Sequence, residues 1–397
     1  MNLSSSERRN ALSLGLVALS ASLAINIYVP AFPMIAADLR VSVPQVQFSL
    51  VGFLLGLAVG QNIYGPLSDR FGRRAPLCIG IMLFAITSIG AGCANSIEAL
   101  VVWRVAQGIG ACAPIAIPRA IIRDLHTGPR ATRMLALVLL VMSASPLFAP
   151  MIGSAIIAHF PWQALFWLLA LMALASLLLV LMLIPETWPA EHRRSTNIWR
   201  GYGQLLRGRR FLALAGTLAC AQAAYYAFLS GSSLVLIEIY GIGAWHYSLV
   251  LGVGAAAWIF GAQLASALMT RVGAARLVRA SLAAGMLTVA IVFVATAARW
   301  DGLTLIVIAV PALFMTIGAI APIVTVWALH PHSNAAGTAT AILGTGNFAG
   351  GALSGALVSL VADGTALPLF GVMALCIAGA NALLWYATPN AARPSAA

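Results

Sequence analysis

Long apolar runs alternate with short polar segments along nearly the whole chain. Each run is close to the length of about 20 residues that an α-helix needs to cross the hydrocarbon core of a bilayer. We count twelve runs, at residues 11–33, 45–65, 75–94, 98–119, 132–158, 163–184, 211–237, 246–268, 277–298, 303–327, 335–360 and 367–387. The pattern predicts an all-α polytopic membrane protein with twelve transmembrane helices.

The short polar segments indicate the orientation of these helices. The chain holds 22 basic residues, and all of them are arginine. Nineteen fall in segments on one side of the predicted helices, only Arg40 and Arg299 fall on the other, and Arg104 lies inside a run. Arginine-rich loops remain on the cytoplasmic side, so we expect both termini to be cytoplasmic. The net charge of +12 therefore reflects membrane topology, and no nucleic-acid partner is expected.

The longest polar segment divides the twelve runs into six and six. We expect an N-terminal half at residues 1–184, a cytoplasmic linker at 185–210 and a C-terminal half at 211–397. A weak repeat supports this division, because Thr270-Arg271-Val272-Gly273 follows the eighth run as Asp69-Arg70-Phe71-Gly72 follows the second. Repeated halves of this kind are typical of secondary transporters, whose site lies near the membrane midplane.

The second and third runs are joined by Gly65-Pro66-Leu67-Ser68-Asp69-Arg70-Phe71-Gly72-Arg73-Arg74. Its glycines favour a sharp turn, and Asp69 has arginine partners within reach. Any polytopic protein can have a basic turn as a topology anchor, but this order of residues resembles the helix 2–3 loop of the major facilitator superfamily. The resemblance implies that Gly65, Asp69, Arg70, Gly72, Arg73 and Arg74 act in gating.

Two further segments resemble one branch of this superfamily in particular. The second run ends with Gly60-Gln61-Asn62-Ile63-Tyr64-Gly65-Pro66-Leu67-Ser68-Asp69-Arg70, and the fourth contains Arg104-Val105-Ala106-Gln107-Gly108-Ile109-Gly110. Both look like the bicyclomycin/chloramphenicol-resistance (Bcr/CflA-type) drug-efflux branch of the superfamily. The resemblance implies outward transport of small antibiotics in exchange for protons.

The fifth run contains Ser145-Pro146-Leu147-Phe148-Ala149-Pro150-Met151-Ile152-Gly153-Ser154. This segment is similar to the antiporter motif of the superfamily, with small residues at several of its glycine positions. Small residues let helices approach closely and proline bends them, so Pro146, Pro150 and Gly153 are candidates for a gate. Close packing without gating is the alternative.

Polar residues inside the runs are candidates for a substrate or proton pathway. Arg104 is the most informative, because a charge inside a membrane helix is costly unless it faces a wet cavity or a partner. Its alternative role is to bind carbonyls of a broken helix. The other candidates are Asn26, Tyr28, Gln61, Gln107, Tyr226, Ser230, Glu238 and Asn347. Each of these could instead serve helix packing.

No acidic residue is central in a predicted span. Transporters of the branch resembled usually carry an aspartate in the first span, two residues before the tyrosine, and this chain has Asn26 there. An amide does not titrate, so the resemblance leaves the proton route open. Glu238 and Asp38 are the acids nearest the expected cavity mouth, and Glu238 is the better candidate for a proton carrier, because it continues the apolar segment 234–237, where we expect it to be partly buried. Its alternative role is an ordinary loop acid.

The sequence thus predicts a proton-coupled exporter of neutral or zwitterionic amphiphilic compounds, such as phenicol- or bicyclomycin-like antibiotics. We expect it to act as a monomer in the bacterial inner membrane, with a small molecule, protons and lipid as partners. The chain offers no nucleophile–base pair and no third ligand near His330 and His332, so we expect no enzymatic activity, cofactor or metal. A metabolite transporter, an uncoupled facilitator and a non-transporting membrane sensor or enzyme are the alternatives.

Overall fold

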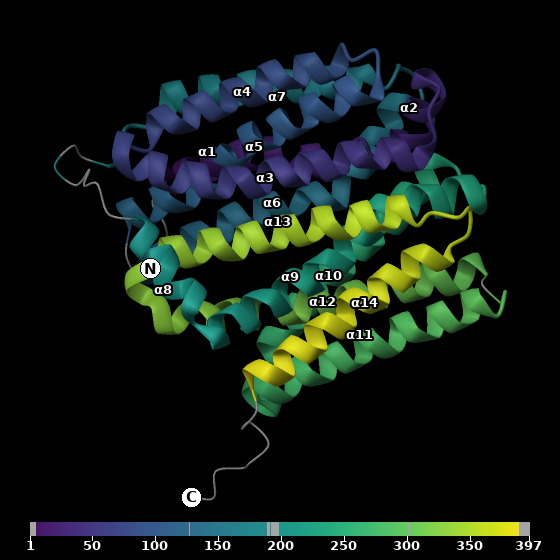
Figure 1. Cartoon of the computed structure of the whole chain (residues 1–397). Coiled ribbons are helices and arrows are strands. Elements are labelled where there is room, and N and C mark those ends of the chain that lie inside the picture. The colour runs from purple at the N-terminus through teal and green to yellow at the C-terminus, as the bar shows by residue number, and fades with distance from the viewer. Residues whose placement is uncertain (1–4, 127, 189–190, 192–197, 301, 389–397) are drawn as a thin grey trace, which may run out of the picture. The chain divides into compact units, whose positions relative to one another are not determined.

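The computed structural model describes residues 5–126, 128–188, 191, 198–300 and 302–388. Within these ranges the chain is helical and contains no β-strand (Figure 1). Twelve of the described helices are long and apolar enough to cross a membrane. The predicted all-helical fold with twelve membrane-spanning helices is confirmed.

The helices form two compact units. Unit 1 spans Met1–Thr196 and Gly243–Gly252, and unit 2 spans Asn197–Ile242 and Val253–Ala397. The elements of unit 1 are α1 (Ser5–Asn26), η1 (Val29–Ala31), α2 (Phe32–Leu39), α3 (Val43–Phe71), α4 (Arg74–Gly92), α5 (Ile97–Leu125), α6 (Gly128–Ile157) and α7 (Gln163–Leu183). Those that follow are α8 (Ile198–Arg207), α9 (Arg209–Ser233), η3 (Leu234–Ile239), α10 (Ala244–Val272), α11 (Ala274–Ala297), α12 (Leu303–Leu329), η4 (His330–Ala335), α13 (Ala336–Leu360) and α14 (Leu367–Ala387).

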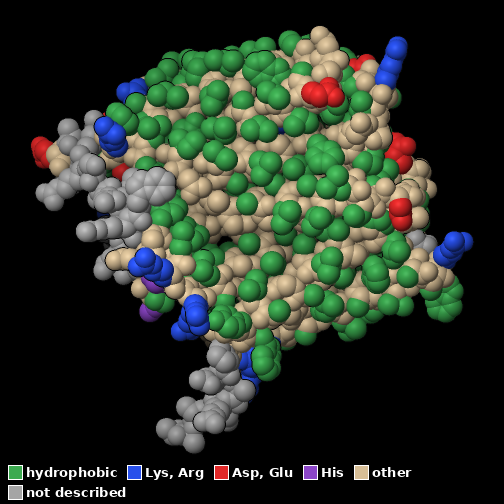
Figure 2. Space-filling model, viewed as in Figure 1, with side chains coloured by type: hydrophobic (Ala, Val, Ile, Leu, Met, Phe, Trp, Pro, Cys, Tyr) green, Lys and Arg blue, Asp and Glu red, His purple; other side chains and the backbone are tan. Residues whose placement is uncertain are grey.

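The outer flanks of the helices are apolar. Figure 2 shows hydrophobic side chains spread over these flanks and charged side chains gathered at helix ends. Ile79, Leu171 and Val294 are each more than 60% exposed, which would be costly in water over so wide a surface. In a bilayer the same side chains contact lipid, as the lengths of the helices require.

Glycines bring helix pairs into close contact in each unit. A Cβ atom at Gly56 would lie 2.1 Å from the Val105 carbonyl oxygen, so α3 and α5 touch through their backbones. In unit 2, a Cβ atom at Gly261 of α10 would lie 2.0 Å from the Met315 carbonyl oxygen of α12. Such contacts are typical of membrane helices. The hydrophobic effect does not drive helices together within lipid, so they associate through close packing at small residues.

The turn between α3 and α4 is shorter than the sequence analysis predicted. Helix α3 continues through Pro66 to Phe71, so most of the polar stretch is helical, and only Gly72 and Arg73 separate it from α4. Gly72 has φ 92°, and Gly273 has φ 86° in the corresponding turn between α10 and α11. A residue with a side chain rarely adopts this conformation. The structure therefore reproduces the repeat found in the sequence.

The first membrane span is broken near Pro30 and Pro33. Helix α1 ends at Asn26, η1 forms one short turn, and α2 completes the span to Leu39. Pro30 has no amide hydrogen and cannot donate to the preceding turn, so the regular helix cannot pass through it. The break places the start of η1 beside α6.

Candidate functional site

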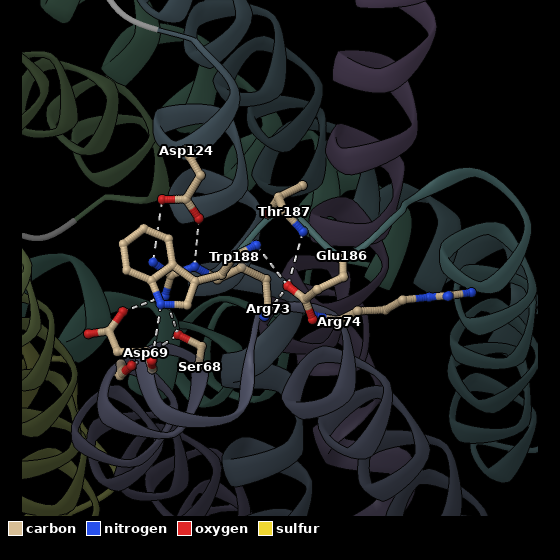
Figure 3. Close-up of polar contacts among 9 residues, drawn as sticks. Ser68, Asp69, Arg73, Arg74, Asp124, Glu186, Thr187 and Trp188 are labelled. Carbon is tan, nitrogen blue, oxygen red and sulfur yellow. Dashed lines mark hydrogen bonds and ion pairs between the residues drawn. The ribbon is translucent and has the colours of Figure 1, made fainter. Parts of the chain in front are cut away.

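A cluster of charged residues lies at the α3–α4 turn of unit 1, as Figure 3 shows. Arg73 is at its centre and is only 6% exposed. Its Nε donates to Asp124 Oδ2 at 2.7 Å, and its Nη1 pairs with Asp69 Oδ1 and donates to Ser68 Oγ at 2.8 Å. The cluster thus links the end of α3 to the end of α5.

Burial and ion pairing have opposite effects on Arg73. Burial disfavours the charged guanidinium, but the carboxylates of Asp124 and Asp69 outweigh it and raise the pKa of Arg73. The guanidinium therefore stays charged. Its two carboxylate partners come from different helices, so the guanidinium links α3 to α5, and separating the two helices would break a charged hydrogen bond.

The other residues predicted at this turn have different surroundings. Arg70 is exposed and lies beside the Phe71 ring, and Arg74 Nη2 donates to the Leu181 carbonyl oxygen at 2.6 Å. Gly65 makes no close contact within the described residues, since a Cβ atom there would meet nothing within 4 Å. Of the three arginines, only Arg73 forms ion pairs within the described residues.

The corresponding turn of unit 2 lacks such a cluster among its described residues. Gly273 has the same positive φ as Gly72, but Thr270 replaces Asp69 and Ala274 replaces Arg73 at the repeat offset. The backbone of the turn is therefore repeated without its charges. We infer that the charges of the first copy serve a purpose other than forming the turn.

Arg104 lies in the interior of unit 1 and is fully buried. Its guanidinium carbon lies 4.0 Å from the centre of the Phe53 ring and 4.2 Å from that of Tyr28. Nη2 donates to the Ala24 carbonyl oxygen at 3.0 Å, and Nη1 donates to Gln107 Oε1. Aromatic faces attract a desolvated cation, so the rings replace part of the missing hydration.

The contacts of Arg104 stabilise the broken first span. Ala24 lies in the last turn of α1, whose final carbonyls have no partner within a continuing helix. Gln107 Nε2 donates to Ser88 Oγ at 2.7 Å and so ties the same network to α4. This geometry matches the alternative role considered for Arg104, binding to a carbonyl of a broken helix.

Three other pathway candidates also lie in unit 1. Tyr28 is fully buried, and its hydroxyl accepts from Ser49 Oγ at 3.4 Å. Asn26 is 5% exposed, and Gln61, on α3, is 9% exposed. Tyr28 shares the Arg104 cluster, whereas Gln61 lies about two helical turns after Phe53, the α3 residue whose ring faces Arg104. The pathway roles of these residues stay predictions.

Helix α6 carries the predicted gate residues and makes close contacts within unit 1. A Cβ atom at Gly153 would lie 1.9 Å from the Ile27 carbonyl oxygen, where the first span breaks. Pro150 offers a carbonyl oxygen that accepts from Ser248 Oγ at 2.9 Å, and Ser248 and Ser154 hydroxyls lie 2.5 Å apart. Pro146 is partly exposed. The small residues thus permit contact on two sides of the helix.

We expect alanine at Gly153 to destabilise the protein. The added methyl group would overlap the Ile27 carbonyl oxygen, and forcing an extra carbon into a packed site costs about 1–3 kcal/mol. Thermal unfolding of purified protein measures the loss. Gly346→Ala in α13 is the control, because its Cβ atom would lie 3.6 Å from Ala219 Cβ, an ordinary contact. Equal unfolding temperatures for the two variants would contradict the close approach of α6.

Unit 2 contains an aromatic group with polar neighbours. Tyr225 lies 5.2 Å from Trp258 and 5.1 Å from Phe314, measured between ring centres, and Tyr226 lies 6.2 Å from Phe348. Four buried polar atoms of α9 and α13 have no hydrogen-bond partner among the described residues: Gln222 Oε1, Ser230 Oγ, Ser233 Oγ and Asn347 Oδ1. Unpaired buried polar atoms are costly, so these atoms are suited to bind a ligand or water.

Glu238 lies in η3, the π-helical end of the seventh span. The helix extends through this residue, but its side chain is exposed. The expected partial burial of Glu238 is therefore wrong. Successive residues of a helix point in different directions, so apolar neighbours in sequence do not imply that Glu238 is buried. The proton-carrier role loses the physical argument on which it rested.

Sequence reasoning missed two residues of the Arg73 cluster. Glu186 and Trp188 follow α7 and contact the α3–α4 turn, although more than 100 residues separate them from it in sequence. No local pattern marks such a contact. The sequence contains one signal for these two residues. An acid and an aromatic residue directly follow an apolar run, at the start of the polar segment 185–210, which carries the most arginines.

The twelve membrane-spanning helices, the two units and their repeated turns are those of a polytopic membrane protein. The chain matches the Major Facilitator Superfamily over residues 14–355. The match covers most of the chain, so the protein belongs to this superfamily and is a membrane transporter of small molecules, not an enzyme.

Several relatives agree with this assignment. The chain is 32% identical to the Bacillus subtilis (strain 168) protein named "Uncharacterized MFS-type transporter YdgK", over 91% of this chain and 90% of the relative. It is 31% identical to the "Bicyclomycin resistance protein homolog" of Haemophilus influenzae, over 92% of each. A match to "Multidrug resistance protein MdtL" of Escherichia coli O157:H7 has 32% identity and covers 58% of this chain and 59% of the relative.

Solved structures support the fold. The nucleoside transporter NupG has a TM-score of 0.74 and 13% identity, over 96% of this chain and 99% of that one. The xylose transporter XylE of E. coli, in a partially occluded inward-open conformation, has a TM-score of 0.73 and 16% identity, over 96% and 98%. At such low sequence identity, these similarities show only that the fold is shared.

Proposed function

We propose that the protein exports small, neutral or zwitterionic amphiphilic drugs from the bacterial cytoplasm, as a monomer in the inner membrane. Relatives named for bicyclomycin resistance and multidrug resistance support the drug class. The predicted excess of arginine on one side supports cytoplasmic termini. Alternating access between the two units would move the drug.

The observation that carries the substrate class is the distribution of acidic side chains. Every described acid lies near a helix end or in a loop, and none lies in the middle of a span. A cation in a low-dielectric site needs a carboxylate partner, because an unpaired buried charge is very costly. Lipophilic monocations should therefore be poor substrates.

The polar atoms of unit 2 support the same class. Gln222 Oε1 and Asn347 Oδ1 are amide oxygens, which accept hydrogen bonds, while the hydroxyls of Ser230 and Ser233 can also donate. The rings of Tyr225, Trp258 and Phe314 provide an apolar surface beside them. A neutral drug with hydroxyl and amide groups matches this combination.

An uncoupled facilitator is the second candidate, and two observations favour it. Asn26 stands where the branch resembled usually has an aspartate, and Glu238 is exposed. We propose proton exchange as the driving force, because export of a drug against its concentration gradient needs a source of energy. The alternative predicts equilibration of the drug without proton movement.

Proteoliposomes with an internal pH-sensitive dye test substrate class and coupling together. We expect wild-type protein to transport a phenicol at least about tenfold faster than a lipophilic monocation, the factor that 1.4 kcal/mol of unpaired charge would produce. Addition of the phenicol should also start a proton flux across the liposome membrane, which the dye reports. Equal transport of both compounds would overturn the charge argument, and phenicol transport without proton flux would establish the facilitator.

Two variants examine the proton route in the same assay. Glu238→Gln should abolish proton flux if this residue carries the proton despite its exposure, and should leave it unchanged otherwise. Asn26→Asp should admit monocations, because it adds a carboxylate to the first span. Empty liposomes and protein without drug provide the baseline.

A further inference from the structure

The segment Pro185–Trp188 connects the end of α7 to the charged turn. Glu186 Oε1 accepts from the Arg73 amide at 2.8 Å, and Oε2 accepts from the Arg74 amide at 3.2 Å. These amides belong to the N-cap residue and the first residue of α4, and amides at this end of a helix have no acceptor within the helix. A carboxylate at a helix N-terminus is further favoured by the helix dipole. Glu186 therefore caps α4 from outside the helix.

The same carboxylate also orders its own segment. Glu186 Oε1 accepts from the amides of Thr187 and Trp188, both at 3.0 Å, which fold the chain into a compact turn. Partial burial acts to raise the pKa of Glu186, but the backbone amides of Trp188, Arg73, Arg74 and Thr187 outweigh it and lower the pKa. Glu186 is therefore ionised at neutral pH.

Trp188 packs against the Arg73 side chain (Figure 3). Its indole ring lies 4.8 Å from the Arg73 guanidinium carbon, and its Nε1 donates to the Asp69 carbonyl oxygen at 3.1 Å. The ring excludes water from one face of the guanidinium, which strengthens the ion pairs of Arg73 in the remaining low-dielectric space. One segment thus contacts the charged residue, the end of α3 and the start of α4.

We propose that Pro185–Trp188 is a strap that positions Arg73 for its ion pairs, with Glu186 and Trp188 as positioning residues for the gating turn. The strap is the first part of the linker predicted at residues 185–210. The turn can then rearrange only when the strap releases it, so the linker and the gate move together. Only the expected effect of the strap on the transport rate rests on the proposed function.

Hydrogen exchange of the full-length protein in nanodiscs tests the strap without any substrate. The probe is the exchange of the Arg73 and Arg74 amides, which donate to Glu186. We expect Glu186→Ala to speed their exchange by about tenfold or more, since hydrogen bonds to a charged group are among the strongest in proteins. Glu191→Ala, which removes an exposed acid of the same linker, is the matched control. Exchange within twofold of wild type in Glu186→Ala, or an equal increase in Glu191→Ala, would overturn the strap.

A double-mutant cycle separates positioning of Arg73 from general stability. Trp188→Ala should speed exchange at the turn in the wild-type background and have a clearly smaller effect once Arg73→Ala is present, because only the hydrogen bond from the indole to the Asp69 carbonyl oxygen is then left to lose. Trp188→Phe keeps a ring without the indole donor and provides a milder variant if alanine prevents folding. Equal effects of Trp188→Ala in both backgrounds would show that Trp188 does not act through Arg73.

Transport measurements then connect the strap to function. Glu186→Ala should lower the maximal rate several-fold and leave KM for the drug unchanged, since the strap lies outside the proposed substrate site. A raised KM with an unchanged maximal rate would contradict the link to gating. If wild-type protein transports no tested drug, the proposed function fails, while the exchange results still decide the strap.

Discussion

Replacing Arg73 with alanine should cause the largest loss of stability and transport of any change at the α3–α4 turn. The substitution leaves Asp124, whose side chain is only 11% exposed, without its guanidinium partner. Breaking a buried ion pair by removing one partner costs about 3–5 kcal/mol, and the half-exposed Asp69 favours the lower end of that range. Thermal unfolding and drug transport in proteoliposomes measure the two losses.

Two further variants define the cause of this loss. Arg73→Lys keeps the charge but not the planar fork that reaches both carboxylates, so it should lie between wild type and Arg73→Ala. Arg70→Ala is the control, because Arg70 is exposed and surface substitutions change stability by only about 0.5 kcal/mol. If Arg73→Ala unfolds at the wild-type temperature, the ion pairs do not stabilise the turn.

The second large effect is expected at Arg104. Arg104→Ala removes the donor to the Ala24 carbonyl oxygen and to Gln107, and it empties a space between the Tyr28 and Phe53 rings. Two charged hydrogen bonds of about 1.5–3 kcal/mol each are lost in a site that water does not reach. We expect transport to be abolished and the first span to lose its fixed position.

Lysine should restore only part of this function. Its ammonium group is a single point of charge and cannot lie flat between two rings while donating in two directions. Val102→Ala, on the lipid-facing side of the same helix and 67% exposed, should transport normally. Wild-type transport by Arg104→Ala would exclude both a pathway role and a positioning role. Reduced transport at an unchanged unfolding temperature would favour the pathway.

The sequence alone determined the membrane spans and the repeat. Span length follows from the thickness of the bilayer and from local apolarity, so each run could be recognised without its neighbours. The repeated turn was equally accessible, because Gly72 and Gly273 occupy the same place in a repeated pattern and both adopt positive φ. These properties depend on residues close together in the chain.

Tertiary structure alone decided how the polar groups are paired. Three arginines occur together at the α3–α4 turn, yet only Arg73 reaches Asp124, since the end of α5 lies against that side of the turn. Arg104 was recognised as unusual, but its aromatic neighbours come from three separate segments, at Tyr28, Phe53 and Phe166. Helix direction likewise decided that Glu238 is exposed. The partners of a charge depend on which helices pack together, and hydrophobic periodicity does not contain that information.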